Sequence, residues 1–466
     1  MSRNRIDIHC HLFSKHTLSR KILSLLIKQL TQVSLRKIDI KKSGAKNFYQ
    51  NIDVFEAEFD KIAKINNFLK IANSSNSELI YKKLQKVEKN YIIAPLTLDL
   101  DFCFYKELSS EQKKKNDEKL LTEFKSLKLT LDTNIKNVTL DLKKLFTLHI
   151  RHKNISIEEN TTSKIKKFKT TKREFDKLTD KLGEEKLSFI ENDYKYDASF
   201  HSQIEQIKQL KQNDKYSDKV FPFLSVDPRR KNILQFVKQN VGKNKIFYGV
   251  KIYTPTGYSP TDPVLFGTEN DNDCVYKFCE ENGIPITAHC SDAGFATFAN
   301  KLNITGVIYR YKEIIRVDDF QLYFKYSVVK DGLKAVQERG EILNHPLLWE
   351  QVLQKFPNLY LNLAHFGGKN DEWRQHIIDL MSKYKNLYAD LSGLYSKDLL
   401  IKIRNNFYKK LPDNIKNKIM YGSDYYIVTI FESDFEKYLN NFEKVFSNAD
   451  FDKLTIDNPS KFLFER

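Results

Sequence analysis

The sequence has no long hydrophobic run, few cysteines and an uneven supply of proline and glycine. No stretch approaches about 18 uncharged apolar residues, so we expect no membrane span. The start of the chain, MSRNRIDIHCHLF, enters an apolar segment at Ile6 without a signal-peptide core, so we expect no secretory signal. The five cysteines form no Cys-x-x-Cys pair, which argues against a disulfide scaffold and favours a cytoplasmic protein.

The chain is rich in apolar side chains and carries an excess of positive charge. Hydrophobic residues make up 41% of it and aromatic residues 13%, enough for a large core, which excludes a wholly disordered chain. The formal net charge of +17 is spread along the chain and is not gathered in one arm. A dispersed lysine excess is typical of a solvated surface, so the charge alone does not favour nucleic-acid binding.

Short apolar segments alternate with helical patterns over most of the chain. We predict eight strands, in the order IDIHCHLF, YIIAPLTLDL, KVFPFLSVD, KIFYGVKIY, GIPITAHC, LYLNLAHF, NLYADLSG and KIMYGSDY. Helical patterns lie between successive strands, at 231–241, 272–282, 347–356, 371–384 and 397–409. This alternation predicts a parallel sheet with crossover helices, and eight repeats favour a closed (β/α)8 TIM barrel of the α/β class over an open sheet.

One long segment departs from the alternation. No proline occurs between Pro95 and Pro222, and residues 105–200 contain the single glycine Gly183. Apolar residues recur there at helical spacing among lysines and glutamates, so we predict a long helical insertion between strands two and three. The expected domains are 1–103, with strands one and two and an enlarged helical connection, the insertion at 104–200, and the rest of the barrel at 201–466. Further insertions are expected at about 14–88 and 296–340.

Five of the predicted strands end in side chains suited to a metal site. Strand one ends in His9-Cys10-His11, and alternation along a strand places the two histidines on one face. Active sites of these barrels lie at the C-terminal ends of the strands, so both imidazoles can reach one ion there. Strands four, five, six and eight end in Lys251, His289, His365 and Asp424.

Each of these residues also has a structural explanation. A lone histidine is more often part of the barrel packing than a ligand, and Asp424 alone could cap the helix that follows. Lys251 is harder to explain in this way, because a charged amine in the middle of an apolar strand is costly to bury. All five positions coincide at strand ends in barrel order, which favours a functional site.

Several segments together resemble the amidohydrolase superfamily of metal-dependent hydrolases, in its amidohydrolase-2 branch. They are IDIHCHLF, FPFLSVDPRR, GVKIYTPTGYSP, ITAHC, HPLLWEQVLQKFPNLYLNLAHFGG, YGSDYY and IDNPSKFLF. In binuclear members a carboxylated lysine bridges two ions, and Lys251 stands at the matching place. We expect one Zn²⁺ ion and leave two ions open. The resemblance implies that His365 contacts the water or the substrate, and that the metal ligands are His9, His11, His289 and Asp424.

The expected activity is hydrolysis of a carbonyl or ester-like bond in a small substrate. A zinc ion with an open coordination position lowers the pKa of its bound water to about 7. Asp424 would move the proton from the water to the leaving group, and Lys251, if uncarboxylated, would stabilise the oxyanion. Tyr253 lies two residues beyond Lys251 on the same face and is expected to line the pocket. Arg229 would clamp an anionic group, unless it is an ordinary solvent-facing helix start.

Two other functions stay open on the sequence alone. Some relatives implied by the resemblance are non-oxidative decarboxylases of aromatic or unsaturated acids, and the ligand set does not separate them from hydrolases. In a third interpretation the insertion at 104–200 docks a protein partner or nucleic acid, and the barrel is an effector or scaffold. The oligomeric state is left open.

Overall fold

The computed structural model describes residues 4–14, 17, 68, 70–72, 74–104, 170, 173, 198–432 and 434–465. Contacts between Cα atoms divide the chain into two compact units. Almost all described residues belong to the unit made of Met1–Thr17, Ser74–Lys106 and Tyr196–Arg466; the other unit comprises Leu18–Asn73 and Glu107–Lys195. Most of the predicted insertion at 104–200 lies outside the described residues, so the insertion and its domain boundaries stay predictions.

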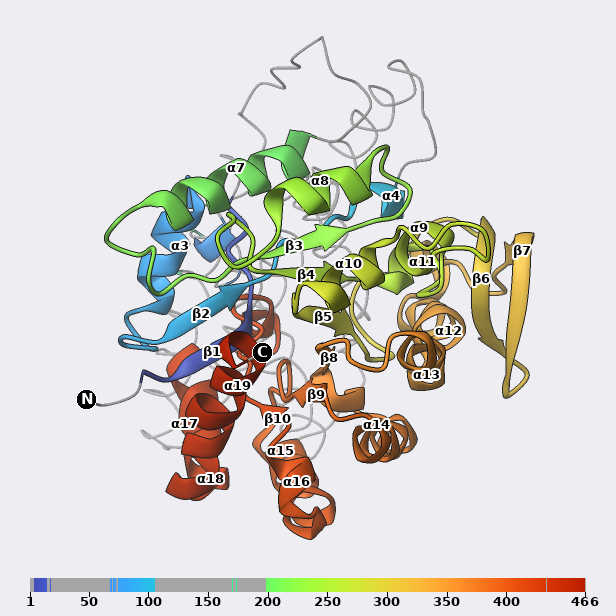
Figure 1. The fold of residues 1–466 in the computed structure, drawn as a ribbon. Coiled ribbons are helices and arrows are strands. Elements are labelled where there is room, and N and C mark those ends of the chain that lie inside the picture. The colour runs from blue at the N-terminus through green and yellow to red at the C-terminus, as the bar shows by residue number, and fades with distance from the viewer. Residues whose placement is uncertain are drawn as a thin grey trace, which may run out of the picture. The chain divides into compact units, whose positions relative to one another are not determined.

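The first unit is built around eight parallel strands (Figure 1). β1 pairs with β2, and a second sheet runs in the order β10-β9-β8-β5-β4-β3. The strands are β1 (Ile6–Cys10), β2 (Ile92–Pro95), β3 (Phe223–Val226), β4 (Gly249–Ile252), β5 (Ile286–His289), β8 (Leu361–Ala364), β9 (Leu387–Asp390) and β10 (Ile419–Met420).

Isolated β-bridges on both sides join the two sheets into a ring. On one side, Ile93 of β2 forms a parallel bridge with Val220, in the segment before β3. Leu96, just after β2, forms another with Phe223, the first residue of β3. On the other side, a parallel bridge from Cys10 to Tyr425 connects β1 to the segment that follows β10. The predicted (β/α)8 barrel is confirmed, and its strands follow the chain order read from the sequence.

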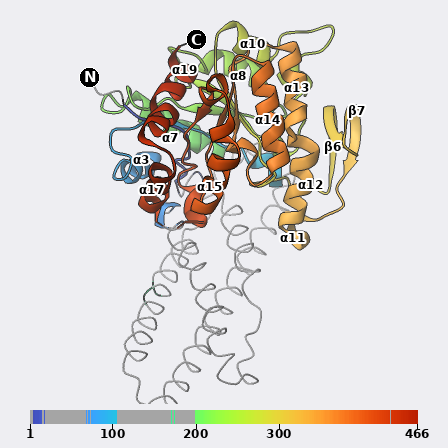
Figure 2. The ribbon, with the colours of Figure 1, turned by 90° about the horizontal axis from the view of Figure 1, so that it is seen from below.

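Helices surround the strands on the outside of the barrel (Figures 1 and 2). The five helical patterns read from the sequence are confirmed as α8, α10, α13, α14 and α15. The described helices are α3 (Ser77–Leu84), α4 (Asp101–Phe104), α7 (Ala198–Gln212), α8 (Ile233–Asn240), α9 (Pro263–Phe266), α10 (Val275–Glu281), α11 (Val328–Asp331), α12 (Leu333–Asn344), α13 (Pro346–Lys355), α14 (Asp371–Lys383), α15 (Lys397–Asn406), α16 (Asp413–Lys416), α17 (Phe435–Val445), α18 (Asn448–Asp452) and α19 (Asn458–Phe464). Among the described residues, none of the helices combines the length and the apolarity needed to cross a membrane.

The insertion expected at 296–340 contains an antiparallel hairpin outside the barrel, made of β6 (Lys301–Arg310) and β7 (Glu313–Tyr323) (Figure 1). Its buried face packs against α12 through side chains such as Ile304 and Leu343. The Val307 amide donates hydrogen bonds to the hydroxyls of Ser259 and Thr261, at 2.9 and 2.8 Å. These bonds tie the hairpin to the loop that follows β4.

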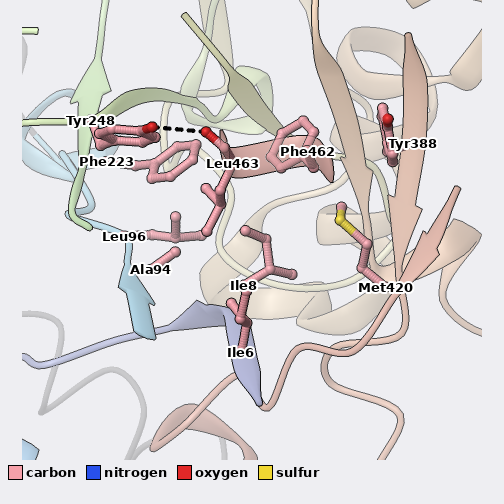
Figure 3. Close-up of a cluster of buried hydrophobic side chains, with 10 residues drawn as sticks. All are labelled: Ile6, Ile8, Ala94, Leu96, Phe223, Tyr248, Tyr388, Met420, Phe462 and Leu463. Carbon is pink, nitrogen blue, oxygen red and sulfur yellow. Dashed lines mark hydrogen bonds between the residues drawn. The ribbon is translucent and has the colours of Figure 1, made fainter. Parts of the chain in front are cut away.

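A cluster of buried apolar side chains joins the C-terminal helix α19 to the barrel strands (Figure 3). Phe462 and Leu463 of α19 pack with Ile6 and Phe223, the first residues of β1 and β3. The Tyr248 hydroxyl, just before β4, donates a hydrogen bond of 2.8 Å to the Leu463 carbonyl. This apolar packing occupies the barrel near the starts of the strands, which leaves the ends of the strands for polar side chains.

Candidate metal centre

His9 in β1 and His11 just after it lie at the end of the barrel where the strands finish. His11 Nδ1 lies 2.9 Å from the carbonyl oxygen of Leu96, an acceptor only, so this nitrogen carries the hydrogen. His9 Nδ1 lies 3.1 Å from Asp390 Oδ2 and donates in the same way. Each ring therefore presents the lone pair of Nε2, the arrangement found in metal-ligating histidines whose other nitrogen is held by a protein acceptor.

Asp424 faces both of these lone pairs. Its Oδ1 lies 3.3 Å from His11 Nε2 and 3.7 Å from His9 Nε2. Burial raises the pKa of the Asp424 carboxyl, but its contacts with His11, His9 and His365 favour the ionised carboxylate more strongly, so this pKa lies below its usual range. The facing lone pairs repel unless a proton or a cation lies between them. The donor atoms of His9, His11 and Asp424 all lie within 4.8 Å of one another, so these three residues could hold a metal ion.

His289 and His365 form a second pair with the same property. His289 Nε2 lies 2.8 Å from the carbonyl oxygen of Ala293 and therefore carries a hydrogen. His365 Nδ1 lies 3.2 Å from the carbonyl oxygen of Ser392 and also carries one. The remaining nitrogens, His289 Nδ1 and His365 Nε2, face each other at 3.0 Å. Two further lone pairs thus meet without a hydrogen of their own.

The rings of His9, His289 and His365 are neutral. Burial lowers the pKa of His9 to about 3, and it lowers the pKa values of His289 and His365 as well. A neutral imidazole is the form that binds a metal. The chemistry of this donor set, nitrogen and carboxylate oxygen, is the one that Zn²⁺ accepts.

Lys251 lies in β4 and is only 1% exposed. Its Nζ has no hydrogen-bond partner among the described residues, and it lies 5.8 Å from the centroid of the Tyr253 ring. Burial lowers the pKa of Lys251 to about 8, and the negative charges of Asp390 and Asp424 oppose this change. A buried amine without a partner calls for an explanation, and a group bound from outside the chain supplies one.

Backbone strain also gathers at this end of the barrel. His365, Phe366 and Asp424 have φ values of 68°, 46° and 53°, in the left-handed region that non-glycine residues rarely adopt. Each such residue costs on the order of 1–3 kcal/mol and persists only where its surroundings fix it. Two of the three carry side chains of the candidate centre.

Tyr253 lies beside the second histidine pair. Its ring stacks on His289 with 4.2 Å between the centroids, and its hydroxyl accepts a hydrogen bond of 2.7 Å from the Phe295 amide. Burial raises the pKa of Tyr253 far above its usual value, so the phenol is neutral. The structure therefore brings this predicted pocket residue to the cluster.

Arg229 is not drawn into the cluster by any contact among the described residues. Its Nε and Nη2 donate to the two carboxylate oxygens of Asp227, at 2.8 and 2.5 Å, and its Nη2 also donates to the Thr256 carbonyl at 3.2 Å. The side chain is 26% exposed, and its guanidinium is paired with the Asp227 carboxylate. Its assignment to substrate binding stays a prediction.

The sequence reasoning missed Asp390, Ser392 and Asn362. Asp390 is the last residue of β9 and is fully buried. It forms a group with His9 and His365 that geometry alone would allow to hold a metal. It accepts hydrogen bonds from the His9 ring, from the amides of His365 and Ser392, and from the side chains of Asn362 and Ser392. The signal was present in NLYADLSG, because a carboxylate ends this strand as Asp424 follows the last one.

Comparison with known proteins identifies the family of the chain. The sequence model of the Amidohydrolase family matches residues 220–464, just over half of the chain. An uncharacterized TIM-barrel protein from Bordetella bronchiseptica is 17% identical, with 56% of this chain and 71% of that chain covered and a TM-score of 0.33. A proposed metal-dependent hydrolase from Lactobacillus casei is 12% identical, with 100% and 96% covered and a TM-score of 0.34. No curated protein matches. Since both TM-scores are below 0.5, the assignment rests on the family model: the chain belongs to the amidohydrolase family and is an enzyme of that type.

Proposed function

We propose that this amidohydrolase is a zinc-dependent hydrolase of a carbonyl or ester-like bond in a small molecule. The observation that carries the proposal is the pair of unprotonated ring nitrogens, on His9 and His11, that face the Asp424 carboxylate. When bound, a divalent ion makes water reactive at neutral pH and polarises the oxygen of the scissile group. The ligands for such an ion would be His9, His11 and Asp424, whose donor atoms lie within 4.8 Å of one another, with His289 as the proposed fourth ligand.

Asp424 is the proposed proton carrier. Gly393 leaves space beside its second oxygen, because a Cβ there would lie 3.2 Å from Asp424 Oδ2 and 3.3 Å from His365 Nδ1. A carboxylate with one oxygen turned to the ligands has a second oxygen that can accept a proton from the attacking water. Asp424 then delivers that proton to the leaving group, while His365 contacts the water or the substrate.

Lys251 is the proposed stabiliser of the oxyanion. Its Nζ is buried and unpartnered among the described residues, so a substrate oxygen would meet a donor that is already desolvated. Tyr253 lines the same side through its stacking on His289. Arg229 contributes positive charge for an acidic substrate group, and its orientation is fixed by Asp227. We also propose that the insertion at 104–200 docks a protein partner.

The test uses the full chain purified without chelators and loaded with one equivalent of zinc. A panel of esters, lactones, amides and unsaturated or aromatic acids is assayed for hydrolysis products and for CO₂. We expect hydrolysis that Asp424→Asn reduces by at least about 100-fold, since the proton carrier is lost. Release of CO₂ without hydrolysis products would show that the enzyme is a decarboxylase. A zinc-loaded protein that is inactive on every compound of the panel would overturn the proposed hydrolase activity.

A further inference from the structure

A single buried carboxylate at the end of β9 collects hydrogen bonds from both histidine pairs. Asp390 Oδ2 accepts from His9 Nδ1 at 3.1 Å and from Asn362 Nδ2 at 2.7 Å. Asp390 Oδ1 accepts from the amides of His365 and Ser392, at 3.1 and 3.0 Å, and from the Ser392 hydroxyl. The carboxylate therefore connects a residue of β1 to the ends of β8 and β9.

Every partner of this carboxylate is a donor. The two amides and the Asn362 amide group cannot accept from it, and the Ser392 hydroxyl makes its closest contact with Oδ1. Both oxygens must therefore accept, and only the ionised carboxylate does so on both sides. An asparagine at this position would turn its NH₂ group toward one of the two sets of donors.

The direction of these bonds fixes the hydrogens on two histidines. Because Asp390 accepts from His9 Nδ1, the hydrogen of that ring lies on Nδ1 and Nε2 keeps its lone pair toward Asp424. Because the Ser392 hydroxyl gives its hydrogen to Asp390, its oxygen accepts from His365 Nδ1 at 2.9 Å, in addition to the Ser392 carbonyl at 3.2 Å, and it also lies 3.0 Å from His9 Nδ1. His365 Nε2 is thereby left as a lone pair toward His289.

We propose that Asp390 is a positioning residue that sets the tautomer of His9 directly and that of His365 through Ser392, and so sets the affinity of the centre for its metal. The inference rests on the proposed function, since it takes His9 as a ligand. It adds a residue that acts by accepting hydrogen bonds from donors of the chain. Acceptors behind a metal-binding histidine typically contribute roughly 10- to 100-fold in metal affinity.

The first test measures zinc affinity of the full chain by competition with a chromophoric chelator. Asp390→Asn is expected to weaken zinc binding roughly 10- to 100-fold. The matched control is Asp227→Asn, a carboxylate just past the end of β3 that is 1% exposed and bonds an arginine instead of a histidine. It should change zinc affinity by less than about threefold. Equal affinities for a folded Asp390→Asn and the wild type would overturn the proposal.

The second test does not depend on that variant folding. In the metal-free wild type with ¹⁵N-labelled histidine, ring-nitrogen shifts report which nitrogen carries hydrogen; His9→Gln and His365→Gln identify the two signals. We expect hydrogen on Nδ1 of both residues. Hydrogen on Nε2 of His9 would overturn the proposal whatever Asp390→Asn does. A wild type that binds no zinc would instead contradict the proposed function, and the two failures are thus distinguishable.

Discussion

Replacing Lys251 by methionine should stabilise the metal-free fold and at the same time remove turnover. The amine is 1% exposed and has no hydrogen-bond partner among the described residues. Burial lowers its pKa from the ordinary 10.5 to about 8, which at ~1.4 kcal/mol for each tenfold change disfavours the folded state by roughly 3 kcal/mol at neutral pH. Methionine fills similar space without charge, so Lys251→Met should recover much of this free energy. Loss of an oxyanion donor should lower kcat about 100-fold or more.

The stability difference between Lys251→Met and the wild type should change with pH. In the unfolded chain the lysine keeps its proton up to about pH 10.5, whereas in the folded chain it loses the proton near pH 8. Over this range the unfolded state binds more protons, so the wild type gains stability as the pH rises. The advantage of Lys251→Met should therefore be full below pH 8 and should shrink toward pH 10.5.

Urea unfolding of metal-free protein, followed by circular dichroism at pH 7 and pH 9.5, measures this difference. Lys418→Met is the matched control, because Lys418 Nζ donates to the carbonyls of Met381 and Tyr384 at 2.7 and 2.9 Å. Removing these bonds should destabilise the fold by about 1–2 kcal/mol. If Lys251→Met is as destabilised at pH 7 as this control, the amine is not an unsatisfied buried group and the reasoning fails.

Three further outcomes are expected. His9→Ala should lose most of its metal and all turnover with an unchanged circular dichroism spectrum; full metal occupancy would remove His9 from the ligand set. Burial lowers the pKa of His345 to about 3, so stability should fall as the pH drops below about 6.5, by up to about 1.4 kcal/mol per pH unit. His345→Asn keeps an acceptor for the Leu347 amide and should flatten that part of the acid unfolding curve; an unchanged curve would refute this. Limited proteolysis should cut first within 105–200, and a first cut within 245–295 would contradict the expected domains.

The barrel could be predicted from the sequence because each strand is a short apolar run that ends in a polar residue. The β5 strand, for example, is ITAH, with a buried face on each side and a histidine at its end. Parallel strands buried on both faces appear in the sequence as continuous apolar runs. The helices between them are recognised by apolar residues that recur every three to four positions. Local pattern and global fold agree here, so the order of the strands follows directly.

The hairpin of β6 and β7 could not be recognised in the same way. β7 is exposed along most of its length, with residues such as Phe320 at 39% and Tyr323 at 57%. A strand of this kind has no strict alternation of apolar and polar residues to separate it from a loop. Only its pairing with β6, which packs on α12, makes it a strand.

The grouping of three of the four predicted ligands could be read from the sequence, whereas the residues that support them could not. His9, His11 and Asp424 stand at strand ends in the sequence, and the structure brings their donor atoms within 4.8 Å of one another. Asp390 acts through a hydrogen bond to a ring 381 residues away, and such pairing depends on how the barrel closes. Arg229 has its acceptor two residues back along the chain, at Asp227, and this local ion pair was overlooked.

The metal content of the wild-type chain tests the central claim most directly. Protein purified without chelators is analysed by inductively coupled plasma mass spectrometry, with Lys251→Met measured beside it. The account predicts close to one zinc per chain in both, because His9, His11 and Asp424 bind the ion without the lysine. Two ions per chain, falling to one in Lys251→Met, would replace the single ion by a bridged pair. A folded wild type that holds no metal, and takes up none when zinc is added, would contradict the account.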